Sequence, residues 1–314
     1  MEPQMPQQTV TPSGFQPEEH FVAEPPRVYY SSPANGTTYE TDTLVLRNRQ
    51  PNLGYAALLL AIGGLVLILV SVAVGVFSAL THNQISATSK SVPLLSIMME
   101  ALTFSITYGI AYQVFPRMWR RRFGEVIEWN PQAAKQHILP LIATGAALSI
   151  VAQALESLLT LPKEMPVDAF FKQPSTLWII AVFGTFVAPV CEEVFFRGFL
   201  LRGFAIFFDW IAVPKNDEGR RWWQTTDHLT ERSLVLSGIL TSGLFAAMHA
   251  AQLGWAWNAV GVLWVVGGAL TWVRLRYNSV AASSLVHAAY NGLLFVLMFF
   301  VTDGFRHLDK LSNH

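Results

Sequence analysis

The 314-residue chain contains little charge. Only 13% of its residues are Asp, Glu, Lys or Arg, whereas a soluble domain carries about 25%. Hydrophobic residues make up 52%, and the mean hydropathy is +0.36. Long uncharged runs cause this deficit, which excludes an ordinary soluble domain and predicts an integral membrane protein. The formal net charge is zero, so nothing in the composition attracts nucleic acid, and we expect no such partner.

Cysteine and internal repeats are scarce or absent. The single cysteine, Cys191, excludes an internal disulfide framework and a four-cysteine zinc site. The sequence has no repeated halves. Residues 1–50 are rich in Pro, Gln, Glu and Thr and show neither helical nor strand periodicity. They lack a basic start followed by an apolar core, so we predict a disordered tail rather than a signal peptide.

The rest of the chain contains seven hydrophobic segments that are long enough to cross a membrane. We therefore predict an all-α fold, a polytopic transmembrane helix bundle of about seven spans, within a range of six to eight. The fourth segment is too long for one straight span. We expect its end to continue as an amphipathic helix at the interface, where Arg202 can reach water. The predicted segments are 55–80, 92–115, 138–161, 177–208, 233–252, 253–273 and 279–301.

Basic residues gather before the first segment and after the second, fourth and sixth segments. With seven spans these positions all fall on one face, which the positive-inside rule assigns to the cytoplasm. We therefore predict a multi-pass plasma-membrane protein with a cytoplasmic N-terminus and an external C-terminus.

Three charges interrupt the fourth segment in "PVCEEVFFRGFL", residues 189–200. An ionisable residue at the bilayer centre costs roughly 2.5–3.5 kcal/mol on insertion scales, so it is usually paired or lines a wet cavity. Glu193 and Arg197 are four residues apart and share a helix face, which predicts an ion pair. Glu192 points about 100° away from Glu193, which leaves it free to act as a general base.

Two of the eight histidines lie well inside hydrophobic segments. His249 occurs in "GLFAAMHAA", four residues after Phe245. His287 occurs in "LVHAAYNG", and Asn291 follows on the same helix face. A histidine and an amide on one face can hold a developing oxyanion. Two carboxylates and two histidines can instead bind zinc, or activate water directly.

Other polar residues in the segments have simpler interpretations. We expect Glu100 and Glu156 to form hydrogen bonds between helices. A Cys191 thiolate paired with histidine is a conceivable nucleophile, although an apolar setting disfavours it.

Three short motifs, one from the fourth segment and one around each of the two histidines, together resemble those of a known family. "EEVFFR", "FAAMH" and "HAAYN" are similar to the E-E-x-x-x-R, F-x-x-x-H and H-x-x-x-N motifs of the CPBP family, the CAAX-processing and bacteriocin-processing intramembrane proteases. This family includes relatives of the prenyl endopeptidase. The resemblance covers about residues 177–301, and Asn278 stands where the family pattern leads us to expect Gly.

The resemblance implies an intramembrane endopeptidase that hydrolyses a peptide bond in a membrane-associated or lipidated protein or peptide. Carried over by position, Glu192 and His249 activate the attacking water. His287 and Asn291 line the oxyanion site. A non-proteolytic scaffold or immunity protein of the same family is an alternative. An ion-coupled transporter would also use intramembrane Glu and His, but the absence of repeated halves argues against it.

The resemblance assigns Glu193 and Arg197 to organising their helix. It leaves open a divalent metal such as zinc, with Glu192, His249 and His287 as its ligands, and the sequence has no H-E-x-x-H motif to decide this point. The predicted organisation is a tail (1–50), N-terminal helices (51–165) with a basic loop (116–137), a catalytic core (170–303) and a short C-terminal tail (304–314).

The predicted topology also raises a difficulty. The fifth and seventh spans run in the same direction, which puts His249 near the outer end of its helix and His287 in the inner half of its own. The two histidines can meet only if a helix is shifted, tilted or broken.

Overall fold

The computed structural model describes residues 49–81, 92–162, 165–171, 174–226 and 228–307. The predicted N-terminal tail therefore lies almost entirely outside the described residues. The segment Leu46–His314 forms one compact unit. The described part of this unit contains helices and turns but no strand.

Among the described residues, six helices are long and apolar enough to cross a membrane. This finding confirms the predicted all-helical bundle of six to eight spans. The six are α1 (Leu53–Leu80), α2 (Val92–Trp119), α5 (Ile138–Ser157), the continuous run Thr176–Ala212, α11 (Trp257–Arg276) and α12 (Val280–Val301).

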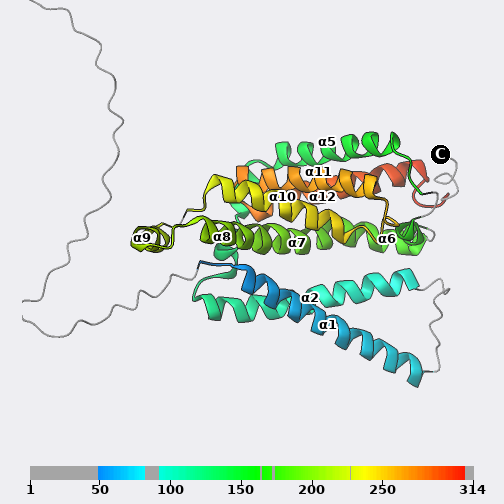
Figure 1. Ribbon diagram of the computed structural model, residues 1–314. Helices are drawn as coiled ribbons and strands as arrows, with labels where there is room; N and C mark the ends of the chain where they lie inside the picture. The colour runs from blue at the N-terminus through cyan, green and yellow to red at the C-terminus, as the bar shows by residue number, and fades with distance from the viewer. Residues whose placement is uncertain (1–48, 82–91, 163–164, 172–173, 227, 308–314) are drawn as a thin grey trace, which may run out of the picture. The chain divides into compact units, whose positions relative to one another are not determined.

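The predicted fifth span is the helix α10 (Glu231–Met248), which is not among these six. Its 18 residues begin with the charged Glu231 and Arg232, which lower its hydropathy. It packs against α11 and against α8 (Leu201–Ala212), and its direction alternates with theirs (Figure 1).

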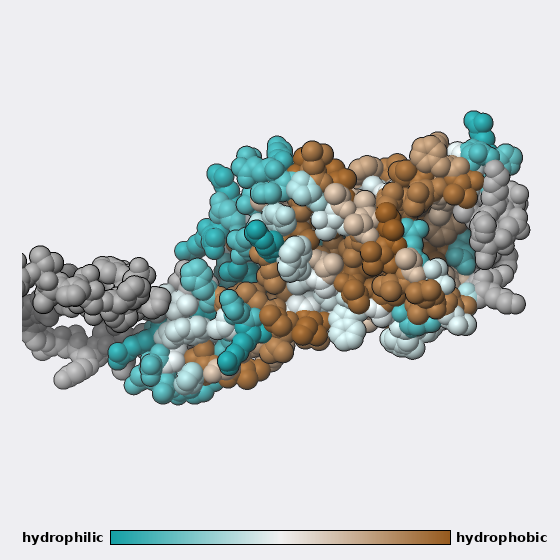
Figure 2. Space-filling model, turned by 90° about the horizontal axis from the view of Figure 1, so that it is seen from above, coloured by the Kyte–Doolittle hydropathy of each residue, from teal (hydrophilic) through white to brown (hydrophobic). Residues whose placement is uncertain are grey.

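The apolar surface of the unit is what a lipid environment requires. Figure 2 shows hydrophobic side chains over the middle of the helices and hydrophilic ones gathered toward the ends. On α1, Leu65, Ile68 and Phe77 are 59%, 60% and 66% exposed. Side chains of this size on a continuous surface favour lipid over water. The chain is therefore an integral, multi-pass membrane protein.

The fourth predicted span is one long helix with two π-helical interruptions, here called the broken helix (Thr176–Ala212). Along the chain it consists of α6 (Pro174–Val182), η2 (Phe183–Val187), α7 (Ala188–Glu193), η3 (Val194–Leu200) and α8. Both η2 and η3 are π-helical turns. They flank the two adjacent glutamates, and such π-bulges often mark functional sites.

The basic loop predicted at 116–137 is partly helical. The helix α2 extends to Trp119, and α3 (Phe123–Val126) and α4 (Pro131–Gln136) follow. Between these short helices, the Glu128 carboxylate accepts hydrogen bonds from Arg202 at 2.6 Å and from Arg274. The loop, the start of α8 and the end of α11 therefore lie together, at the end of the bundle that also carries α9 (Asp217–Thr225; Figure 1).

The helix α10 starts beside the end of α8. The side-chain hydroxyls of Thr230 and Ser233 donate to Asp209 Oδ1 at 2.6 Å and 2.7 Å. The hydroxyl of Thr230 also caps the helix, because it accepts from the Ser233 N–H at 3.3 Å. The first turn of α10 is thus at the level of Asp209.

The helix α12 starts nearer the middle of the bundle. The Val280 N–H donates to the Glu128 carbonyl oxygen at 3.1 Å, and the Glu128 carboxylate in turn binds Arg202. Asp209 lies seven residues beyond Arg202 on the same helix, which is about 10 Å. This offset between α10 and α12 is the shift that two parallel helices need for their histidines to meet.

Candidate active site

Glu193 and Arg197 form a buried ion pair within the broken helix. Arg197 Nη1 donates to Glu193 Oε1 at 2.6 Å, and both side chains are 0% exposed. Arg197 Nη2 donates to the carbonyl oxygen of Gly267 on α11 at 2.8 Å. The guanidinium also lies 4.7 Å from the ring centroid of Phe245 on α10. The residues predicted to pair are in contact, and the pair connects three helices.

A close approach of α10 and α11 makes the Gly267 carbonyl available to this arginine. A Cβ at Gly267 would lie 3.2 Å from the backbone of Ser242 on α10. That distance is tighter than an ordinary van der Waals contact, so a larger residue would push the two helices apart.

His287 brings α12 into the same cluster. Its Nδ1 lies 3.1 Å from Glu193 Oε1, and its Nε2 lies 3.9 Å from Glu192 Oε2. A carboxylate only accepts hydrogen bonds, so Nδ1 carries the proton that it donates to Glu193. The gap of 3.9 Å is too long for a direct hydrogen bond to Glu192. His287 therefore connects the two glutamates without saturating Glu192.

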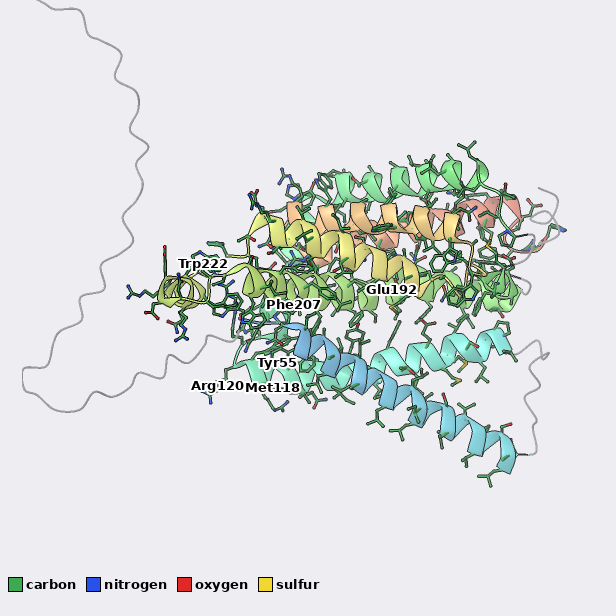
Figure 3. The ribbon with its side chains drawn as sticks, viewed as in Figure 1. Tyr55, Met118, Arg120, Glu192, Phe207 and Trp222 are labelled. Carbon is green, nitrogen blue, oxygen red and sulfur yellow. The ribbon has the colours of Figure 1, made fainter. Side chains whose placement is uncertain are left out.

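The two adjacent glutamates have different surroundings. The Glu193 side chain is fully buried against its arginine, whereas the Glu192 side chain is 21% exposed. Glu192 lies midway along the broken helix (Figure 3). It forms no hydrogen bond with another described residue. This arrangement has one paired glutamate and one available glutamate, as the helical spacing predicted.

His249 caps the end of α10 and lies near His287. Its Nδ1 donates to the Phe245 carbonyl oxygen at 2.8 Å, which leaves Nε2 as an unprotonated acceptor in the neutral ring. The Phe245 ring lies 4.8 Å from the His249 ring and 5.7 Å from the His287 ring, measured between centroids. Both imidazoles therefore contact one phenylalanine. In the described part of the chain, no hydrogen bond joins His249 to either glutamate.

Asn291 stabilises the first π-helical interruption. Pro189 has no N–H, so it cannot donate to the Gly184 carbonyl five residues earlier, and the Ala188 N–H donates to Phe183 instead. Asn291 Nδ2 donates to this Gly184 oxygen at 2.7 Å. The amide thus replaces the hydrogen bond that the proline removes, and this contact uses one of its two N–H groups.

The predicted metal ligands do not form a metal centre in this arrangement. Within the described ranges, no group of three or more His, Cys, Asp or Glu side chains is placed to hold a metal ion. Glu192 and His287 approach one another, but His249 Nδ1 is bonded to its own helix. The Nε2 atom of His249 can still ligate a metal while Nδ1 is bonded in this way, so a bound metal stays a prediction from the resemblance.

Some contacts of the site were not predicted from the sequence. The Tyr108 hydroxyl on α2 donates to the Cys191 carbonyl oxygen at 2.5 Å, beside Glu192. The side chains of Glu100 and Glu156, which we expected to bond to other helices, form no hydrogen bond or ion pair with a described residue. The available local signals were Pro189 and the glycine-rich sixth segment around Gly267, and neither signal identifies its partner.

Comparison with known families covers the segment that contains this cluster. Residues 174–293 match the family model described as type II CAAX prenyl endopeptidase Rce1-like. No curated protein and no solved structure matches the chain. The matched segment contains all three motifs and every predicted site residue. Residues 174–293 therefore belong to the CAAX-protease family of intramembrane proteases, as the motifs predicted.

Proposed function

We propose that the protein is an intramembrane endopeptidase that hydrolyses a peptide bond in a membrane-associated or lipidated protein or peptide. One observation carries this proposal. Glu193 Oε1 accepts from both Arg197 and His287, and Glu192 lies 3.9 Å from the other nitrogen of His287. Residues of two motifs, 94 positions apart, thus form one polar cluster among membrane-spanning helices.

In this reaction Glu192 is the general base. Its carboxylate takes a proton from water while the water oxygen attacks the carbonyl carbon, and the proton then passes to the leaving amine. The unprotonated Nε2 of His249 is a second acceptor for the same water. Glu192 suits this role because no arginine among the described residues forms an ion pair with it and its side chain is partly accessible.

His287 and Asn291 stabilise the oxyanion in the proposed reaction. Asn291 has a second amide N–H besides the one that holds Gly184. His287 Nε2 donates to the oxyanion when the ring carries a second proton. A donor of this kind typically contributes about 10²–10³-fold to the rate. Glu193 and Arg197 act as positioning residues, since they fix the orientation of the imidazole.

The end of the bundle with α9 faces the cytoplasm in this proposal, and the membrane is the plasma membrane. The support is that Arg202 and Arg274 lie at this end, together with the basic residues that follow α2.

The test compares purified wild type with Glu192→Gln and His249→Ala on a library of membrane-protein and prenyl peptides. We expect Glu192→Gln to lower cleavage by about 10²–10⁴-fold without changing Tm, because only proton transfer is lost. Glu156→Gln, an intramembrane carboxylate outside the cluster, is the matched control and should cleave normally. Metal content is measured by mass spectrometry on the same samples. Equal cleavage by Glu192→Gln and wild type would refute the assignment.

A further inference from the structure

A hollow of about 840 Å³ lies where α2 ends and α3 begins, away from the catalytic cluster. It is here called the arginine hollow, because Arg117 and Arg122 line it, together with the single carboxylate of Glu125. The chain carries four arginines and one glutamate between residues 117 and 125, which is a net charge of +3. None of the predicted site residues lines this hollow. Its cationic character therefore has no part in the proposed peptide hydrolysis.

Both arginines of the hollow keep donors for a ligand. The Arg122 side chain is 90% exposed, and its Nε lies 3.9 Å from Glu125 Oε1, which is too long for a hydrogen bond. Arg117 donates from Nη1 to the carbonyl oxygen of Gln113, one turn earlier on α2. A guanidinium has five N–H groups. In the part of the chain that the structure describes, these contacts leave most of the ten donors unused.

The end of α2 opposes an anion only weakly. A helix C-terminus carries roughly half a negative charge, which four guanidinium groups exceed. Arg120 directly follows the helix with a φ of 55°, in the left-handed region where glycine is the common residue. Arg120 and Arg121 are both exposed. Figure 3 shows Arg120 and Met118 at this end of α2. The net field at the end of α2 therefore attracts anions.

Aromatic surface adjoins the cations. Tyr112 and Phe123 line the hollow with ring centroids 5.9 Å apart, and Tyr112 is 68% exposed. Tyr112 precedes Arg117 by five residues, so it lies about 7.5 Å farther from the end of α2. Since α2 is long and apolar enough to span the membrane, this order places the tyrosine toward the hydrocarbon and the guanidinium at the level of the head groups. A ligand with a charged head and an apolar chain matches both parts.

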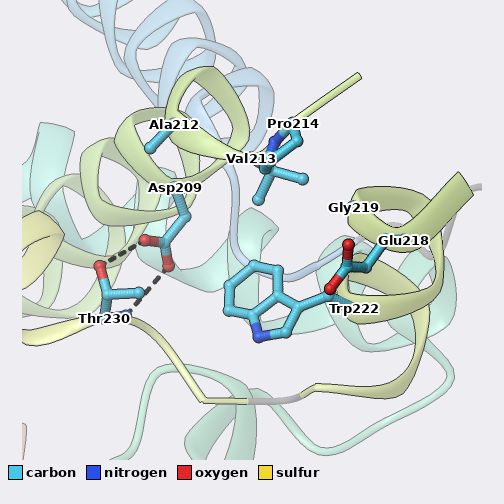
Figure 4. Close-up of a pocket in the computed structure, with 8 residues that line it drawn as sticks. All are labelled: Asp209, Ala212, Val213, Pro214, Glu218, Gly219, Trp222 and Thr230. Atoms are coloured by element: carbon cyan, nitrogen blue, oxygen red, sulfur yellow. Dashed lines mark hydrogen bonds between the residues drawn. The ribbon is translucent and has the colours of Figure 1, made fainter. Parts of the chain in front are cut away.

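The cavity in Figure 4 offers the opposite chemistry. It measures about 370 Å³ and lies between the end of α8 and α9. Its charged lining residues are Asp209 and Glu218, and Trp222 forms part of the wall. Both oxygens of Asp209 accept hydrogen bonds from Thr230. This cavity presents carboxylates instead of guanidinium donors, so the two cavities do not share a ligand.

We propose that the arginine hollow binds the head group of an anionic phospholipid, with the phosphate between Arg117 and Arg122 and the start of an acyl chain beside Tyr112. Arginine binds phosphate through paired N–H···O bonds, and basic pockets beside membrane helices take anionic head groups. Phosphatidylcholine brings a choline cation to the same arginines, so a head group with a net negative charge binds more tightly. The proposal is independent of the proposed protease function.

Native mass spectrometry tests this site on the full chain in neutral detergent, titrated with phosphatidylglycerol or phosphatidylcholine. We expect wild type to bind phosphatidylglycerol about ten-fold more tightly or better. The double variant Arg117→Gln/Arg122→Gln should bind it about 30-fold more weakly with an unchanged Tm, because each arginine near an anionic group contributes roughly five-fold. The matched control is Arg220→Gln/Arg221→Gln, an exposed pair on α9 that does not line the hollow. It should retain wild-type affinity.

Four outcomes overturn the proposal. The first is equal affinity of wild type for the two lipids, and the second is equal binding of phosphatidylglycerol by the two double variants. The third is displacement of the lipid by inorganic phosphate at the same concentration, which would indicate a site for a soluble anion. The fourth is binding that appears only after Glu18, Glu19 and Glu24 are replaced by glutamine, which would make the acidic N-terminal segment the occupant. If the double variant does not fold, Arg122→Gln alone replaces it.

Discussion

The helix α1 and the broken helix are both long enough to cross the membrane, but they use their surfaces differently. Large apolar side chains of α1, such as Ile68 and Phe77, are exposed to the surroundings of the unit. The broken helix buries Glu193 and Arg197 completely against α10, α11 and α12. Hydropathy therefore identifies helices that lie in the membrane. Polar residues inside a hydrophobic segment identify the helix that carries the candidate site.

Backbone regularity differs in the same way. The described turns of α1 are α-helical from Leu53 to Leu80, and Asn52 caps the first turn. The broken helix contains Pro189 and two π-helical segments, and it depends on Asn291 from α12 to satisfy the Gly184 carbonyl. A regular helix satisfies its own backbone, so only the irregular one depends on its neighbours.

The largest expected effect comes from removing the buried cation. Arg197→Ala leaves Glu193 buried and without its counter-charge, which should lower the free energy of unfolding by about 3–5 kcal/mol. Arg121→Ala removes an exposed arginine and should change it by less than about 0.5 kcal/mol. Thermal denaturation in detergent measures both. A similar Tm for the two variants would mean that the ion pair does not hold the helices together.

A smaller effect is expected from tightening a helix contact. A Cβ at Gly145 on α5 would lie 2.4 Å from the Val286 carbonyl oxygen on α12, so Gly145→Ala should destabilise the protein by about 1–3 kcal/mol. Gly64 on α1 has nothing within 4 Å of such a Cβ, so Gly64→Ala is the matched control. The control should be neutral or slightly stabilising, because Ala favours helix. Equal melting shifts would show that α5 and α12 separate easily.

The smallest expected effect is at a contact between α2 and the broken helix. Tyr108→Phe removes the hydrogen bond from α2 to the Cys191 carbonyl, which should lower stability by about 0.5–1.5 kcal/mol. The loss is limited because the Val194 N–H also donates to that oxygen. Tyr112→Phe, at a residue that is 68% exposed on the same helix, should leave Tm unchanged. Hydrogen exchange at α7 that is identical in both variants would contradict a role for Tyr108 there.

Local sequence patterns predicted the positions of the helices and part of the candidate site. Each predicted span is a helix with boundaries within a few residues, because hydrophobic length is a property of contiguous sequence. The pairing of Glu193 with Arg197 followed from four-residue spacing on one helix. The order of the three motifs predicted the family that residues 174–293 match.

The sequence by itself thus determined the membrane fold, the paired and available glutamates, and the set of polar residues that must avoid lipid. Tertiary structure decided which of these groups meet. His287 reaches Glu193 across 94 positions and Asn291 reaches Gly184 across 107 positions. The physical reason is that both contacts depend on the level at which α12 packs against the broken helix, and no local periodicity encodes the level at which one helix packs against another.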